Sequence, residues 1–97
     1  EKDTNAGTNL GLLRNAVRNR AVLDIQYLDL REIRSRRVAR PLGLTVFDDV
    51  WLLTIWCETK TDFRNLRVDR IETAEPIGRR FRPEAGKRFE DYLKMLP

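Results

Sequence analysis

The strongest constraint on how this chain folds is an apolar run near its middle, Val50–Cys57 (VWLLTIWC). Side chains of a strand point alternately to its two faces, and in this run both faces are apolar except at Thr54. A strand of that kind is buried on both sides and lies inside a sheet. The run is far shorter than the roughly 18 apolar residues that indicate a membrane-spanning helix. The sequence therefore predicts a β-fold built around a central strand at Val50–Glu58.

The segments on either side carry the periodicities of further strands and of two terminal helices. Apolar residues at helical spacing from Leu10 to Val17 predict a helix that begins near Thr8. Pro83, followed by amphipathic spacing through Leu96, predicts a second helix at the end of the chain. Four more segments show strand patterns, namely Val22–Asp29, Arg34–Phe47, Phe63–Ile71 and Thr73–Phe81.

Turn-forming residues indicate where the chain bends. Pro41 cannot donate a hydrogen bond to a neighbouring strand, so it is expected at an edge or a bend. Gly43 indicates a bulge or a close approach of another segment, and Asp48-Asp49 is expected to connect a hairpin. The order α-β-β-β-β-β-α predicts a mainly β fold with flanking helices. Its five-stranded, strongly bent antiparallel sheet would form an Sm-like or SH3-like barrel.

The length of 97 residues allows one domain with one core. Residues 1–9 (EKDTNAGTN) are polar and are expected to be a linker, or a tail left where a domain was separated from a longer chain. Residues 10–97 are expected to form the domain. Cys57 lies in an apolar run and no charged-then-apolar leader begins the chain, so we expect a reduced thiol and a cytoplasmic location.

The chemistry open to this chain is limited because it contains no histidine, and Ser35 and Cys57 are its only serine and cysteine. A Ser-His or Cys-His nucleophile pair, an HExxH zinc site and a disulfide framework are therefore excluded. We expect a protein that is not an enzyme and that has no cofactor and no metal site.

Basic residues are clustered and are mostly arginine, with 15 arginines against 4 lysines. The segment Arg31–Arg40 holds five arginines against a single glutamate, a surplus equal to the net charge of the whole chain, +4. A second basic segment, Arg79–Arg88, follows near the end. Clustering of one sign of charge indicates an anionic partner, and arginine suits phosphate because its guanidinium group can bind two oxygens at once.

Two interpretations of the arginines in Phe63–Ile71 stay open. On a continuous strand, Arg64 and Arg70 would share a face with Leu66 and Val68, so each charge would need a partner. The partner of Arg70 could be a carboxylate of this chain, for example Asp24, Glu58 or Asp69. The alternative is an arginine-lined cleft for an anionic ligand. For Trp51 and Trp56, a role in the core is favoured over stacking on a ligand.

Four segments of the chain, taken in order, carry a family pattern. They are Ile25-Gln26-Tyr27, Arg37–Leu44 (RVARPLGL), Trp51-Leu52-Leu53 with Trp56-Cys57, and Phe63–Ile71 (FRNLRVDRI). Together they resemble the WYL domain of bacterial transcriptional regulators, which is named for a Trp-Tyr-Leu tripeptide. The resemblance runs from about Ala16 to Leu93, and Leu52 replaces the tyrosine of the tripeptide.

The resemblance implies an Sm-like barrel that senses a ligand and regulates a winged helix-turn-helix domain preceding it in the same chain. The implied ligand is a nucleotide or a nucleic-acid-derived molecule, such as single-stranded DNA, bound through an arginine-lined cleft. By motif position, the implied ligand contacts are Tyr27, Arg37, Trp51, Arg64 and Arg70, with Arg40 and Arg67 as secondary candidates. Trp51 or Tyr27 would stack on a base. The alternative hypothesis is a dimerisation or protein-interaction module that binds no ligand, in which the arginines pair within the chain.

Overall fold

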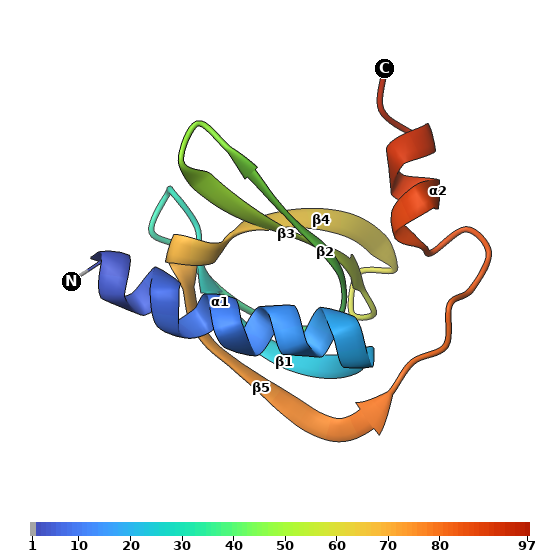
Figure 1. Cartoon of the computed structure of the whole chain (residues 1–97), viewed down its shortest axis with the longest axis horizontal. Coiled ribbons are helices and arrows are strands. Elements are labelled where there is room, and N and C mark those ends of the chain that lie inside the picture. Colours follow the sequence, from blue (N-terminus) through green and yellow to red (C-terminus); the bar gives the residue numbers. More distant parts are fainter. Residues whose placement is uncertain (1) are drawn as a thin grey trace.

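The computed structural model describes residues 2–97, with side chains from residue 9 onwards. It is a five-stranded antiparallel sheet with a helix at each end of the chain, and the strand order is β4-β3-β2-β1-β5 (Figure 1). The predicted fold class is confirmed. The elements are α1 (Lys2–Asn19), β1 (Ala21–Leu28), β2 (Arg34–Phe47), β3 (Val50–Cys57), β4 (Asp62–Arg67), the 3-10 helix η1 (Val68–Arg70), β5 (Ile71–Arg80) and α2 (Phe89–Lys94).

The long strand β2 bends the sheet. Its first half pairs with β1 and its second half pairs with β3, and the β2–β3 register shifts between Pro41 and Gly43. A bulge of this kind bends the strand and increases its twist. β5 returns to pair with β1, so the sheet curls round and α1 lies across it (Figure 1). The bend predicted at Pro41 is confirmed.

The core fills the space between the inner face of the sheet and α1. Leu53, Ile55 and Cys57 on the inner face of β3 are fully buried, and Leu13 of α1 is equally buried against them. The outer face of β3 is covered as well: Thr54 is buried and donates a hydrogen bond to Asn65 Oδ1 at 2.6 Å. The two-sided burial predicted for this strand is confirmed at Leu53–Ile55 and Cys57, whereas Trp51, Leu52 and Trp56 are half-buried.

The helix α2 packs on the outer face of the sheet through aromatic side chains. The ring of Tyr92 lies 5.6 Å from that of Phe63, and the Tyr92 hydroxyl accepts a hydrogen bond from Asn65. Phe89 lies so close to Gly43 that a Cβ atom added to the glycine would be 3.1 Å from the ring. This contact confirms the close approach predicted at Gly43.

Two predicted boundaries differ from the structure. α1 begins at Lys2 rather than at Thr8, so it extends into the predicted linker. The division between residues 1–9 and 10–97 stays a prediction. The strand predicted through Ile71 was wrong beyond Arg67, where η1 turns the chain from β4 towards β5 and buries Val68. The predicted hairpin at Asp48-Asp49 is confirmed, and both residues have the positive φ, 50° and 65°, typical of a two-residue turn.

Within the part of the chain that the structure describes, no helix is long and apolar enough to cross a membrane.

Candidate functional site

The arginines of the described chain fall into two groups, because only some have a carboxylate partner. Those within 4.0 Å of a carboxylate oxygen are Arg34, Arg36, Arg40, Arg64, Arg67, Arg70, Arg79 and Arg88. This group includes four of the candidates carried over from the family motifs. The charges of these four arginines are compensated within the chain, so each contributes to the fold through its ion pair.

Arg70 fastens the turn between β1 and β2. Its Nε donates to the carbonyl oxygen of Leu28 at 2.8 Å, and its Nη2 donates to the carbonyl oxygen of Asp29 at 2.6 Å. Nη2 also lies 2.9 Å from a carboxylate oxygen of Glu32. The carboxylate partner of Arg70 is therefore Glu32 and none of the three acidic residues suggested from the sequence. The alternating pattern of a strand predicted the wrong surroundings for Arg70, because η1 turns this residue towards the β1–β2 turn.

Arg40 is the centre of an ion-pair network between β2, β3 and the segment before α2. Its side chain is 15% exposed, and it contacts Glu58 at 2.7 Å and Glu84 at 2.6 Å. Burial alone would lower the pKa of Arg40, but the bonds to the two carboxylates outweigh it and raise the pKa. Arg79 shares Glu58, and its hydrogen bond is the main cause of the lowered pKa of that carboxyl.

Arg64 and Arg67 each pair with an acidic residue close in sequence. Arg64 contacts Asp62 at 2.7 Å and is 40% exposed. Arg67 forms a two-pronged pair with Asp69, whose oxygens lie 3.0 and 2.8 Å from its nitrogens. Each hydrogen bond lowers the pKa of its carboxyl. Arg64 keeps enough exposure to reach an additional anion.

Arg37 differs from the other motif arginines because no carboxylate lies within 4.0 Å of it in the described chain. Its Nη2 donates to Ser35 Oγ at 2.8 Å, while its Nε is buried with no hydrogen-bond partner. The guanidinium carbon lies 6.0 Å from the ring centre of Tyr27. The Tyr27 hydroxyl in turn accepts a hydrogen bond at 3.0 Å from the backbone N–H of Arg67. A cation held on an aromatic face with no carboxylate beside it is suited to an anionic ligand.

Trp51 lies in a separate hollow beside α1. The indole is half-buried against the core. The hollow has a volume of about 420 Å³ and is lined by Trp51, Leu44, Val17, Arg14 and Arg18. Neither arginine was singled out from the sequence, because both lie outside the two basic segments.

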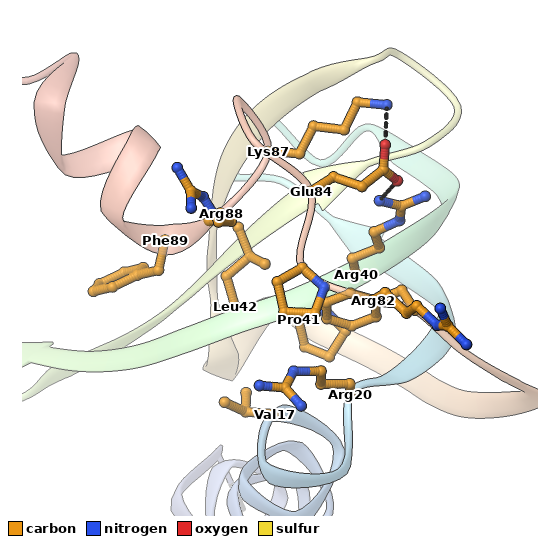
Figure 2. Close-up of a pocket in the computed structure, with 12 residues that line it drawn as sticks. Val17, Arg20, Arg40, Pro41, Leu42, Arg82, Glu84, Lys87, Arg88 and Phe89 are labelled. Carbon is orange, nitrogen blue, oxygen red and sulfur yellow. Dashed lines mark hydrogen bonds and ion pairs between the residues drawn. The ribbon is translucent and has the colours of Figure 1, made fainter.

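A second cleft, of about 190 Å³, lies where the end of α1, the bulge of β2 and the segment 81–89 meet (Figure 2). Figure 2 shows Arg20 extending beneath Pro41 and Leu42 towards Val17. The N–H of Phe81 donates to the carbonyl oxygen of Arg20 at 3.0 Å and so joins two walls of the cleft. Its basic lining residues are Arg20, Arg40, Arg82, Lys87 and Arg88. The basic segment Arg79–Arg88 was the sequence signal for this cleft, but Arg20 gave none.

The motif residues thus do not form a single cleft. Tyr27 and Arg37 lie together, Arg40 lines the cleft of Figure 2, Trp51 lies in its own hollow, and Arg70 is committed to a turn. Within residues 2–97 as described, no three His, Cys, Asp or Glu side chains form a group that could hold a metal ion.

Comparison with known proteins identifies domains that are similar to this chain. A family model described as the WYL domain matches residues 8–76. Among solved structures, Proteasome accessory factor B/C (PafBC) of Arthrobacter aurescens is similar, with a TM-score of 0.76 and 28% sequence identity. The similarity covers 84% of this chain and 13% of that chain, so this chain corresponds to only a small part of it. No curated protein matches the sequence.

Proposed function

The chain belongs to the WYL domain family, and on that premise we propose that it is a ligand-sensing regulatory domain of a bacterial transcriptional regulator. Its effector is a nucleotide or a nucleic-acid-derived molecule such as single-stranded DNA. The domain binds this effector and transmits the binding event to an attached domain, and it catalyses no reaction. The premise supplies the regulatory setting, and the geometry around Arg37 supports the class of ligand.

The observation that carries the proposal is the uncompensated guanidinium of Arg37. Its buried Nε has no hydrogen-bond partner, and a buried donor without a partner is unfavourable. A phosphate group bound at the guanidinium would supply the missing negative charge. Tyr27 beneath the guanidinium holds it in place.

The regulatory step follows from where such a domain sits in a longer chain. The similar structure of PafBC extends well beyond the matched part. We propose that this domain likewise acts within a longer cytoplasmic chain, behind a winged helix-turn-helix domain. Effector binding would change the orientation or the dimerisation of the attached domain, because a ligand shifts an equilibrium towards the state that it binds better.

Binding of a labelled single-stranded oligonucleotide, followed by fluorescence anisotropy over a range of salt concentrations, tests the proposal. We expect Arg37→Gln to weaken binding about tenfold, which corresponds to about 1.4 kcal/mol. It should also reduce the slope of log affinity against log salt by about 0.7, the value for one lost phosphate contact.

Arg34→Gln is the matched control, because Arg34 lies on the same strand but pairs with Glu72 and does not line the cavity that Arg37 lines. It should leave binding nearly unchanged. Absence of salt-sensitive binding by the unaltered domain, or equal losses in the two variants, would contradict the proposed site.

The alternative of a ligand-free dimerisation module has its own supporting observation. Apolar side chains are exposed at the turns that end β1 and β2, with exposures of 65% for Leu30, 54% for Val46 and 72% for Phe47. Light scattering separates the two hypotheses. A dimer that is indifferent to oligonucleotide and is lost in Phe47→Ser favours the alternative.

A further inference from the structure

We propose that the C-terminal half of α1, together with Trp51 and Arg82, forms a second binding surface, which holds a strand of single-stranded nucleic acid. The surface is distinct from Arg37 and involves arginines outside the family motifs. The inference rests on the proposed function only for the class of ligand. Its location follows from the distribution of uncompensated charge and of cavities.

The first observation is that four unpaired arginines line two neighbouring cavities. In the described chain, Arg14, Arg18, Arg20 and Arg82 have no carboxylate within 4.0 Å. The first two line the hollow beside Trp51 and the other two line the cleft of Figure 2. Val17 lines both cavities, so the two are neighbours along α1.

The second observation is the spacing of Arg14 and Arg18. Residues four apart lie on one face of a helix, with Cβ atoms roughly 6 Å apart, and two like charges at this spacing destabilise the helix. Arg18 gains some stabilisation from the negative end of the helix dipole, whereas Arg14 lies a turn earlier. An anion bound between them would remove the repulsion, and a phosphate group can accept hydrogen bonds from both guanidinium groups.

The third observation is that each cavity suits a different part of a nucleotide strand. The hollow of about 420 Å³ presents the half-buried indole of Trp51 beside Val17 and Leu44, a surface on which a base can stack. The cleft of about 190 Å³ is smaller than typical small-molecule sites and suits a phosphate group rather than a base. A strand with a base on Trp51 would carry its next phosphates towards Arg20 and Arg82.

These contacts are made with the π-face of a base and with the phosphate oxygens of the nucleic-acid backbone. Neither differs greatly among the four bases, so the surface binds single strands with little sequence preference. A duplex would bind less well, because its bases are stacked on one another and cannot lie on Trp51.

The experiment uses the Trp56→Phe variant, in which Trp51 is the only tryptophan and reports stacking through its fluorescence. The probes are a ten-residue oligothymidylate and an abasic oligonucleotide of the same length and charge. We expect both to bind in anisotropy measurements, and we expect only the oligothymidylate to quench Trp51. Equal quenching by both probes, or by neither, would overturn the stacking contact.

The charge contacts are tested by the double variant Arg14→Gln/Arg18→Gln. It should weaken oligothymidylate binding at least tenfold and reduce the salt slope by about 1.4, the value for two lost phosphate contacts. Arg31→Gln is the matched control, since Arg31 is exposed and unpaired in the described chain but lies in the β1–β2 turn. Denaturation curves verify that each variant folds. Equal effects of the double variant and the control would overturn the inference.

The two proposed sites fail separately. Loss of binding in Arg37→Gln alone would leave the proposed function standing and overturn the surface on α1. Loss in Arg14→Gln/Arg18→Gln alone would leave the surface on α1 and the class of ligand standing, and it would overturn Arg37 as the binding site. An unaltered domain that binds neither probe would overturn both.

Discussion

Arg70 illustrates how a charged residue in a functional-looking motif can serve the fold instead. Its guanidinium donates to two backbone carbonyls of the β1–β2 turn and contacts Glu32, and its side chain is only 23% exposed. The sequence indicated that this arginine needs a partner. It could not indicate which one, because Leu28 and Asp29 lie about 40 residues away along the chain and are reached through backbone atoms that carry no residue identity.

Replacing Arg70 with glutamine should destabilise the domain by about 1–3 kcal/mol, because two partly buried carbonyls lose a charged donor. Arg70→Lys should lose less, since it keeps one donor and the charge. Urea denaturation followed by tryptophan fluorescence measures the difference, and Arg31→Gln in the same turn is the control. A loss no larger than that of the control would contradict the structural role given to Arg70.

Arg37 is the motif arginine that has no carboxylate partner in the described chain, and the reason could not be read from the sequence. Its neighbours Arg34, Arg36 and Arg40 all find carboxylates on other segments. Arg37 lies opposite Ile25 in the sheet and meets Tyr27 and Ser35 instead. Strand alternation separates Arg36 from Arg37, but only the tertiary structure shows which of the two faces lacks an acid.

Among the elements, prediction succeeded where a local pattern and the tertiary environment agree. The bounds of β2 follow from its alternating pattern and from the turn residues at its ends. Pro41 and Gly43 predicted the bend within it. Prediction failed beyond Arg67, because Leu66 and Val68 continue the alternation of a strand while the chain turns through η1. Leu66 and Val68 are both buried in the structure, as a continuous strand would also predict. Periodicity alone therefore could not distinguish a strand from a strand that ends in η1.

The docking of α2 depends on the missing side chain of Gly43. Gly43→Val should push Phe89 away and loosen α2, because even a Cβ atom would lie 3.1 Å from the ring. Faster tryptic cleavage at Lys87 and Arg88 would report the loosening. In a Phe89→Ala background the same valine should have little further effect, because the ring is gone. Additive effects of the two substitutions would show that they act independently and would contradict this contact.

In the whole molecule, the distribution of charge differs most from what the sequence indicated. Arg31–Arg40 holds the surplus of basic residues in the sequence. In the structure, Glu72, Asp24 and Glu58 from other segments compensate three of its arginines. Its other two arginines, Arg31 and Arg37, have no carboxylate within 4.0 Å in the described chain. The same holds outside the segment for Arg14, Arg18, Arg20, Arg80 and Arg82. Counting charges along the chain cannot detect pairing between strands, which is why the sequence did not indicate which arginines stay unpaired.

The ion pairs predict how the stability of the molecule changes with pH. Hydrogen bonds from Arg79 and Arg40 hold the pKa of Glu58 below its ordinary 4.5 in the folded state. Glu58 therefore contributes stability above about pH 4.5, and this contribution is lost as the pH falls through the lower pKa of the folded state. The carboxyls of Asp24, Asp62 and Asp69 are shifted in the same direction.

Urea midpoints of the unaltered domain and of Glu58→Gln should differ most near neutral pH and converge in acid. Glu75→Gln is the control, because Glu75 is exposed on β5 and has no basic group within 4.0 Å in the described chain. A difference between the unaltered domain and Glu58→Gln that stays constant from neutral pH to pH 3 would rule out the proposed linkage.

The bonds from Arg70 to the β1–β2 turn also bear on the order of folding. The turn can form its own hydrogen bonds early, because Asp29 Oδ1 accepts from the N–H groups of Arg31 and Ile33 nearby. The bonds from Arg70 join residues 41 and 42 positions apart, and closing so long a loop costs entropy that is recovered only after β2, β3 and β4 have assembled. We therefore expect them to form after the rate-limiting step, and an interaction of that kind slows unfolding without speeding folding. Arg70→Gln is then expected to shorten the lifetime of the folded domain and to leave its folding rate nearly unchanged.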